Sequence, residues 1–183
     1  MKVIDFKGFK FNVRHDLAQS PPGNNIRHRD NAFLRDGELV LQIKKIKDQW
    51  TSAEIILEDT KKEGVYILDL EKPRFLNKSL VAAVFLYEND KNELDIEFTQ
   101  WNHFFLPNVW VTEQDPYRTK MSLSFKKDHL IVIQRDKDKE LLVWNKKLFT
   151  SKKIKNGKLM ISLWHYGNPK EAEIKIKDIH YIK

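Results

Sequence analysis

The chain has 183 residues, a formal net charge of +7, and 41% hydrophobic and 32% charged residues. This length and composition indicate a single globular domain spanning residues 1–183 and exclude an intrinsically disordered chain. The absence of cysteine excludes a disulfide framework, thiolate chemistry and cysteine-ligated zinc.

The first residues, Met1 to Phe6, form no uninterrupted apolar segment and precede no small-residue cleavage site, so no signal peptide is visible. No later segment is long and apolar enough to span a membrane. The sequence leaves the compartment open: intracellular, or secreted or periplasmic if the sequence is part of a longer chain. Lysines are spread along the chain, which favours a solvated surface over a nucleic-acid-binding arm.

The longest irregular segment that we expect runs from His15 to Asn31 and contains the sequence Ser-Pro-Pro-Gly-Asn-Asn. Proline and glycine fix the path of such a loop, and its polar side chains can donate and accept hydrogen bonds. Loops of this length in a compact domain are often functional. Asn25 is therefore a candidate sugar-binding residue, and a surface loop without a binding role is an equally good alternative.

Short alternating or apolar runs recur along the chain and predict β-strands. These runs are Val40–Ile43, Glu54–Leu57, Val65–Leu70, Leu80–Tyr87, Asn92–Phe98, Met121–Phe125, Leu130–Ile133, Leu141–Trp144, Lys158–Trp164 and Glu173–Ile176. Turn residues such as Asp36-Gly37 and Asn156-Gly157 separate them at intervals of roughly 8 to 12 residues, as in a sandwich or barrel. No long segment has helical periodicity. The sequence thus predicts an all-β, mainly antiparallel β-sandwich of a dozen or more strands.

Three carboxylates alternate with apolar residues in the predicted strand Asn92–Phe98: Glu93, Asp95 and Glu97. In a strand all three would project from one face, although acidic residues are disfavoured there and like charges repel. The Cα atoms of Glu93 and Glu97 would lie about 13 Å apart, and side chains that lean together would bring their carboxyls to about 5 to 6 Å. This separation is typical of a retaining glycosidase. The alternative is an amphipathic strand with solvated acids, and periodicity alone does not distinguish the two.

Retaining hydrolysis needs one ionised and one protonated carboxyl group close together. Asp95 between the two glutamates favours this state, because three interacting acids do not all ionise easily. We assign Glu93 as the nucleophile, Glu97 as the general acid/base, and Asp95 as the group that holds Glu93 in place. The reverse order of the two glutamates is chemically possible.

The segment Glu93-Leu94-Asp95-Ile96-Glu97 resembles the Glu-x-Asp-x-Glu signature of glycoside hydrolase family 16, a β-jelly-roll family that includes lichenases, laminarinases and agarases. Other segments resemble the family in the same order along the chain. They are Asp30–Leu41, Trp50–Glu54, Gly64–Tyr66, Ala83–Tyr87 and Lys158–Trp164. The resemblance implies a concanavalin A-like jelly roll of two bent antiparallel sheets, with the signature strand on the floor of a concave cleft.

The resemblance also implies the activity of a retaining endo-β-glycosidase on a polysaccharide of the β-glucan or galactan class. It places Glu54 at a substrate-binding position and Trp164 at the cleft wall. Trp101 and Trp110, on the strands that flank the signature strand, and His103, which follows Trp101, are further candidates for sugar contact. Aromatic rings pack well against the C–H face of a pyranose. For each tryptophan the alternative to sugar contact is a position in the core of the sandwich.

We expect no cofactor and no metal, because the six histidines are scattered without zinc-site spacing and no dense oxygen-ligand loop for calcium is evident. The expected partner is a polysaccharide or oligosaccharide substrate, with no nucleic acid and no membrane, and the protein is expected to be a monomer. Two other functions stay open: a non-catalytic, lectin-like carbohydrate-binding β-sandwich, and a basic β-sandwich that binds a polyanion through its lysines.

Overall fold

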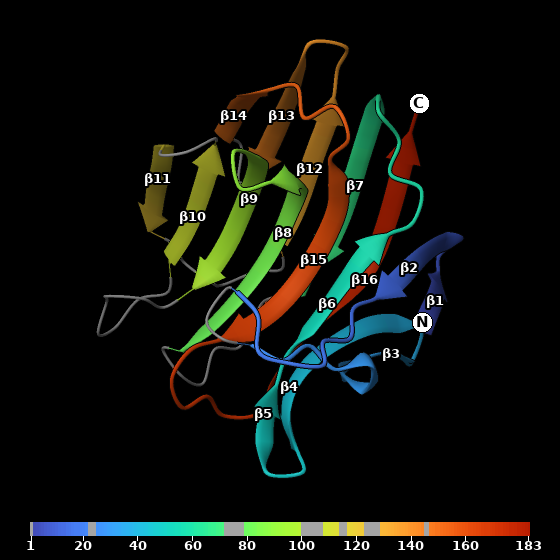
Figure 1. Cartoon of the computed structure of the whole chain (residues 1–183). Helices are drawn as coiled ribbons and strands as arrows, with labels where there is room; N and C mark the ends of the chain where they lie inside the picture. The colour runs from blue at the N-terminus through green and yellow to red at the C-terminus, as the bar shows by residue number, and fades with distance from the viewer. Residues whose placement is uncertain are drawn as a thin grey trace.

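The computed structural model shown in Figure 1 describes residues 2–21, 25–71, 79–99, 108–113, 117–122, 129–144 and 147–183. Apart from one 3-10 turn, Arg29–Asn31, the regular secondary structure of these residues consists of β-strands. They form two antiparallel sheets, which confirms the predicted all-β sandwich. No helix in the described part of the chain has the length and apolar character needed to cross a membrane.

The first sheet has eight strands and carries the signature segment. Its order is β1 (Lys2–Phe6), β2 (Phe9–Val13), β6 (Ala53–Leu57), β15 (Lys158–His165), β8 (Leu80–Asn89), β9 (Asn92–Thr99), β10 (Asn108–Glu113) and β11 (Tyr117–Ser122). Figure 1 shows that the long central strands β15 and β8 are curved. The strand order also shows that strands far apart in the sequence, such as β6, β15 and β8, lie side by side in the middle of this sheet.

The second sheet packs against the first. Its order is β14 (Lys147–Lys152), β13 (Lys139–Trp144), β12 (His129–Arg135), β7 (Gly64–Leu70), β16 (Ala172–Ile182), β4 (Glu38–Ile46) and β3 (Ala32–Arg35), and β5 (Gln49–Thr51) pairs with β4. The β3–β4 hairpin turns at Asp36-Gly37, where both residues have positive φ as a two-residue turn requires. The predicted turn at this dipeptide is confirmed.

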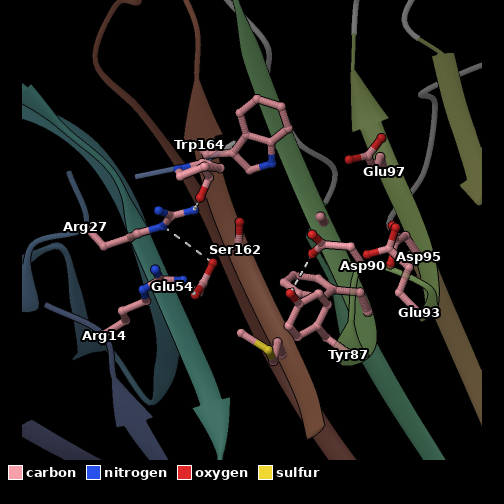
Figure 2. A pocket seen from close by; sticks show the side chains of 14 residues that line it. Arg14, Arg27, Glu54, Tyr87, Asp90, Glu93, Asp95, Glu97, Ser162 and Trp164 are labelled. Atoms are coloured by element: carbon pink, nitrogen blue, oxygen red, sulfur yellow. Dashed lines mark hydrogen bonds and ion pairs between the residues drawn. The ribbon is translucent and has the colours of Figure 1, made fainter. Parts of the chain in front are cut away.

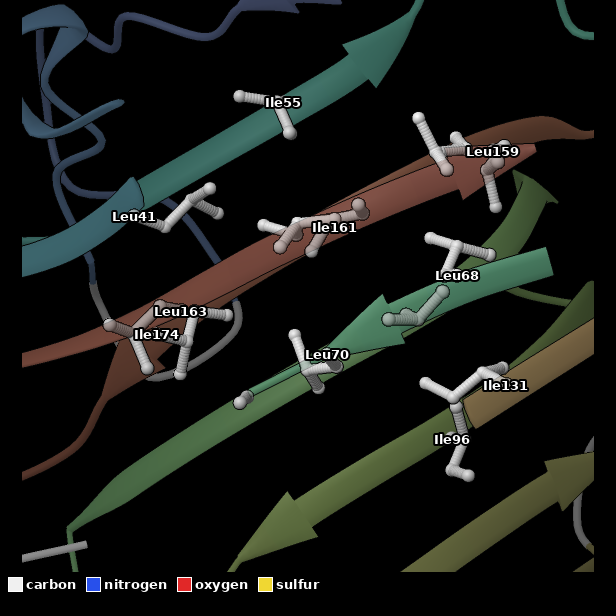
Figure 3. Close-up of a cluster of buried hydrophobic side chains, with 14 of the residues drawn as sticks. Leu41, Ile55, Leu68, Leu70, Ile96, Ile131, Leu159, Ile161, Leu163 and Ile174 are labelled. Atoms are coloured by element: carbon white, nitrogen blue, oxygen red, sulfur yellow. The ribbon is translucent and has the colours of Figure 1, made fainter. Parts of the chain in front are cut away.

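The core lies between the two sheets and follows from the period of two along each strand. On β15, Leu159, Ile161 and Leu163 are fully buried and point toward the second sheet. Figure 3 shows them close to Leu68 and Leu70 of β7. Burying each such side chain stabilises the fold by about 1.5–3 kcal/mol. The alternate residues of the same strands face away from the core, and on the first sheet this outer face contains the candidate site.

The tight β8–β9 hairpin sets the register of the signature strand. The side chain of Asn89 accepts hydrogen bonds from the backbone N–H of Lys91 and from the amide of Asn92, both at 3.1 Å. These bonds stabilise the turn locally. The register that results places Glu97 opposite Ala83 of β8. The turn therefore fixes which side chains surround each acid.

Candidate active site

Strand β9 separates its apolar and acidic side chains onto its two faces. Leu94, Ile96 and Phe98 are at most 1% exposed and belong to the core. The acids Glu93, Asp95 and Glu97 are half-buried and line a cavity of about 580 Å³ on the other face of the sheet. The strand is thus amphipathic, and its acidic face forms the wall of a hollow.

A row of four residues crosses the floor of this cavity. Ser162 of β15 pairs with Glu54 of β6 on one side and with Ala83 of β8 on the other. Ala83 in turn pairs with Glu97 of β9. Neighbouring strands are about 4.8 Å apart, so the backbones of Glu54 and Glu97 are separated by about 14 Å. Since Ser162 and Ala83 are small, the space between these two carboxylates is left open.

Larger side chains border this open row. On one side of it along the strands, Phe85 of β8 pairs with Met160 of β15 and with Asp95, and Tyr87 pairs with Glu93. Trp164 of β15 lies on the other side of the row, and its ring packs edge-on against Tyr166 at a centroid distance of 5.3 Å. Aromatic and apolar surfaces of this kind suit the C–H face of a pyranose.

Figure 2 shows how the charged groups are divided between two sides of the cavity. Glu93, Asp95 and Glu97 lie along one side, and Glu54 lies along the other with Arg14 and Arg27. Such a division allows a ligand to contact acids on both sides.

Glu54 is held by two arginines. Arg27 is 1% exposed, and its Nε lies 3.5 Å from Oε2 of Glu54. Arg14 donates from Nη1 to Oε1 of Glu54 at 2.8 Å. A carboxylate that is only 3% exposed needs such partners, because an unpaired buried charge is strongly destabilising. The two guanidinium groups therefore keep Glu54 in place at the cavity wall.

Asp16 and Ser20 complete this network. Asp16 accepts from Nε of Arg14 at 2.9 Å and from Nη1 of Arg27 at 3.2 Å. Ser20 bonds to Asp16 at 2.8 Å and also accepts from Arg27. Burial alone would raise the pKa of Asp16, but hydrogen bonds from Ser20, Arg14 and the Arg27 backbone outweigh it and lower this pKa. Burial likewise acts to lower the pKa of Arg14, and its bonds to Glu54 and Asp16 raise it overall.

The candidate sugar-binding residue Asn25 is not among the described residues that line the cavity. Its side chain is fully buried, donates to the backbone oxygen of His165 at 2.8 Å and accepts from the backbone N–H of His165 at 3.0 Å. This pair of bonds ties the N-terminal loop to the end of β15, next to Trp164. The contacts give Asn25 a scaffolding role, and its contact with a sugar stays a prediction.

The other predicted contact residues are placed as follows. Glu54 and Trp164 line the cavity together with the three acids of β9. Trp110 of β10 pairs with Glu97 across the strands and is half-buried, but it is not part of the described cavity lining. Trp101 and His103 lie outside the described residues.

Sequence reasoning did not single out Arg14, Asp16, Tyr87 or Asp90 for this site. Tyr87 and Asp90 line the cavity beside Glu93, and the Tyr87 hydroxyl donates to Asp90 at 2.8 Å. The alternation of β8 places Tyr87 on the same face as Ala83, and this pattern could have indicated its position. No pattern in the sequence indicates the loop residues Arg14 and Asp16.

No protein-family model matches the sequence, and no curated protein sequence matches it. Solved structures match the fold. A β-glucanase from Bacillus licheniformis has a TM-score of 0.72 at 13% identity, with 97% of this chain and 93% of that chain covered. A glycosyl hydrolase family 16 protein from Mycobacterium smegmatis has a TM-score of 0.67 at 15% identity, with 92% of this chain and 90% of that chain covered.

A κ-carrageenase from Pseudoalteromonas carrageenovora, solved in complex with a κ-carrageenan oligosaccharide, has a TM-score of 0.65 at 12% identity. The match covers 98% of this chain and 92% of that chain. At these identities the similarity is one of fold. The chain shares, over nearly its whole length, the β-jelly roll of structural neighbours that are glycoside hydrolases, which confirms the predicted fold class.

Proposed function

We propose that this protein is a retaining glycoside hydrolase that cleaves β-linked polysaccharide of the β-glucan or galactan class. The observation that carries the proposal is the position of Glu93, Asp95 and Glu97, which line one cavity from a single strand. The fold supports it, because the structural neighbours that share this jelly roll include a β-glucanase and a κ-carrageenase.

In the proposed mechanism, Glu97 donates its proton to the glycosidic oxygen while Glu93 attacks the anomeric carbon. The bond between that carbon and the leaving oxygen breaks, and a covalent glycosyl ester forms on Glu93. Glu97, now ionised, then takes a proton from a water molecule that attacks the same carbon. Two inversions at one centre return the product to the original configuration. Asp95, between the two glutamates on the same face, favours retention of the proton that Glu97 must donate.

The proposed substrate position follows from the floor of the cavity. A sugar ring over Ser162 and Ala83 would have Glu97 on one side and Glu54 on the other. Trp164 offers an aromatic face to the ring, and Glu54 accepts hydrogen bonds from its hydroxyls. Because two arginines hold Glu54 rigid, its oxygens are positioned before the substrate arrives.

The test is an activity screen on mixed-linkage and β-1,3-glucans, agarose and carrageenans, followed by three variants. Glu93→Gln and Glu97→Gln should each lose more than about a thousandfold in kcat/KM on any polymer that is cleaved, because each removes a group in direct contact with the reacting atoms. The matched control is Glu173→Gln on β16, an exposed residue of the second sheet paired with Arg35. It should retain activity.

Activity that survives either active-site substitution would refute the assigned roles. Saccharide binding without any reducing-end product would instead favour the lectin-like alternative on the same cavity.

A further inference from the structure

The two arginines that contact Glu54 differ in their exposure to the cavity. The side chain of Arg27 is 1% exposed, and its guanidinium group bonds within the N-terminal loop. The side chain of Arg14 is 36% exposed and lines the cavity next to Glu54, as Figure 2 shows. Part of the Arg14 guanidinium group is therefore open to a ligand in the cavity.

The protein uses only some of the hydrogen-bond donors of Arg14. A guanidinium group has five N–H donors. Three of them have acceptors: Nε donates to Asp16 at 2.9 Å, Nη1 to Glu54 at 2.8 Å, and Nη2 to the hydroxyl of Ser20 at 3.4 Å. The remaining donors, on Nη1 and Nη2, have no acceptor within the described part of the chain. A ligand in the cavity can therefore accept hydrogen bonds from Arg14.

Glu54 provides an acceptor next to these donors. Its Oε1 accepts from Arg14, whereas the contact of its Oε2 is with Nε of Arg27 at 3.5 Å, which is longer than a usual N–H···O bond. This nitrogen forms no hydrogen bond with any residue that the structure describes. Oε2 thus keeps its capacity to accept a hydrogen bond. Because Nη1 and Oε1 are bonded to each other, the open donors and the open acceptor lie side by side on different groups.

We infer that Arg14 and Glu54 together recognise two adjacent hydroxyl groups of one sugar, so that the sugar bound there must have a free vicinal diol. The inference rests on the proposed function and selects a substrate class within it. One hydroxyl donates to Glu54 and its neighbour accepts from Arg14, and hydrogen bonds to charged partners are the stronger kind.

The linkage of the polysaccharide decides whether such a diol is present. An interior 4-linked pyranose has free hydroxyls on the adjacent carbons 2 and 3, whereas an interior 3-linked pyranose has no two adjacent ring hydroxyls free. A 3-linked sugar would leave Glu54, which is only 3% exposed, or Arg14 without its partner, and sites built to bond a hydroxyl strongly reject ligands that lack it. The favoured substrate is therefore a β-glucan or β-galactan with 4-linked units.

The experiment measures binding to the Glu93→Gln variant, which removes turnover, and compares polymers that differ in linkage. The pairs are a mixed-linkage β-1,3-1,4-glucan with a linear β-1,3-glucan, and a β-1,4-galactan with a β-1,3-galactan. In the pair that is bound, we expect at least about tenfold tighter binding of the polymer with 4-linked units. In the unmodified protein, kcat/KM should follow the same order.

Substitution of Arg14 in the Glu93→Gln background identifies the group that reads the diol. Arg14→Gln should weaken binding of the 4-linked polymer about tenfold and that of the 3-linked polymer less than about twofold. Arg14→Lys keeps a cation beside Glu54 but not the forked donors, so it should lose most of the same affinity with less risk to folding. The matched control is Arg35→Gln, because Arg35 is a similarly exposed arginine, bonded to Glu173 on the second sheet. It should change neither affinity.

A selective loss for the 4-linked polymer in the Arg14 variants supports the inference. Equal losses for both polymers, no loss for either, or equal binding of the 3-linked polymer before substitution would overturn it, and cleavage by the unmodified protein would leave the hydrolase function standing. Selective binding without cleavage by the unmodified protein would support recognition of the diol and refute the hydrolase function. Failure to bind any of the polymers would overturn both.

Discussion

Arg27 and Glu54 form a buried ion pair at the edge of the cavity, with Nε of Arg27 3.5 Å from the Glu54 carboxylate and side-chain exposures of 1% and 4%. The pair joins the N-terminal loop to strand β6. Because the same loop is tied to β15 through Asn25 and the His165 backbone, two separate contacts hold it against the floor of the site. The geometry of the cavity therefore depends on residues that would not touch a substrate.

Removing Arg27 should destabilise the protein strongly. Arg27→Met leaves the buried carboxylates of Glu54 and Asp16 with fewer partners, and breaking a buried pair costs about 3 kcal/mol of unfolding free energy. Urea denaturation measures this value. Arg35→Met, which breaks the exposed pair with Glu173, should lower the unfolding free energy much less, because exposed ion pairs contribute little to stability. Equal losses in the two variants would contradict a stabilising role for the buried pair.

The core between the sheets should respond to truncation at β15. Ile161 is fully buried and lies between the sheets, so Ile161→Ala should lower the unfolding free energy by about 2–5 kcal/mol through lost burial and the cavity that remains. The control is Leu34→Ala, whose side chain is 49% exposed and should cost much less. A similar loss in both would mean that Ile161 is not in a packed core.

Trp164 should contribute to ligand binding more than to chemistry. Trp164→Ala should raise KM for the cleaved polymer by about tenfold, corresponding to about 1.4 kcal/mol of lost stacking, with a smaller change in kcat. Trp164→Phe should recover part of the loss, because it keeps an aromatic face. Steady-state kinetics on an oligosaccharide series measures both constants. A fall in kcat alone, with KM unchanged, would argue against a stacking role.

The pH dependence of stability should include a contribution from His165. Its side chain is 7% exposed, neither ring nitrogen bonds to another described residue, and burial lowers its pKa below the usual 6.5. The unfolded chain therefore binds a proton at a higher pH than the folded one, so stability falls as pH drops below about 6.5, by at most about 1.4 kcal/mol per pH unit. His165→Phe should remove this slope. Urea denaturation between pH 5 and 7.5 compares the two proteins, and identical slopes would contradict the expectation.

The strand pattern could be predicted because it depends on local alternation. In the segment Asn92–Phe98, apolar residues alternate with acids. Burial of the apolar residues Leu94, Ile96 and Phe98 on one face of the strand places the acids on the opposite face. Strand β2 has the same kind of signal in Phe9, Phe11 and Val13, but its segment is short and was not predicted.

The ion-pair network could not be predicted in the same way. Arg14 and Glu54 are 40 residues apart, and they meet only because β6 lies next to β2 in the folded sheet. Asn25 belongs to a segment whose polar residues, proline and glycine are typical of an exposed loop. In the structure its side chain is fully buried, and its amide group bonds to backbone groups of β15. Contacts of this kind are set by sheet order, which residue spacing does not determine.

The stereochemistry of the first product tests the central proposal most directly. Proton NMR during the early cleavage of a β-glucan oligosaccharide resolves the two anomers before they interconvert. If Glu93 and Glu97 act as nucleophile and acid/base, the β-anomer appears first and the α-anomer accumulates only by mutarotation. An α-anomer formed first would show single displacement by water and would contradict the double-displacement mechanism.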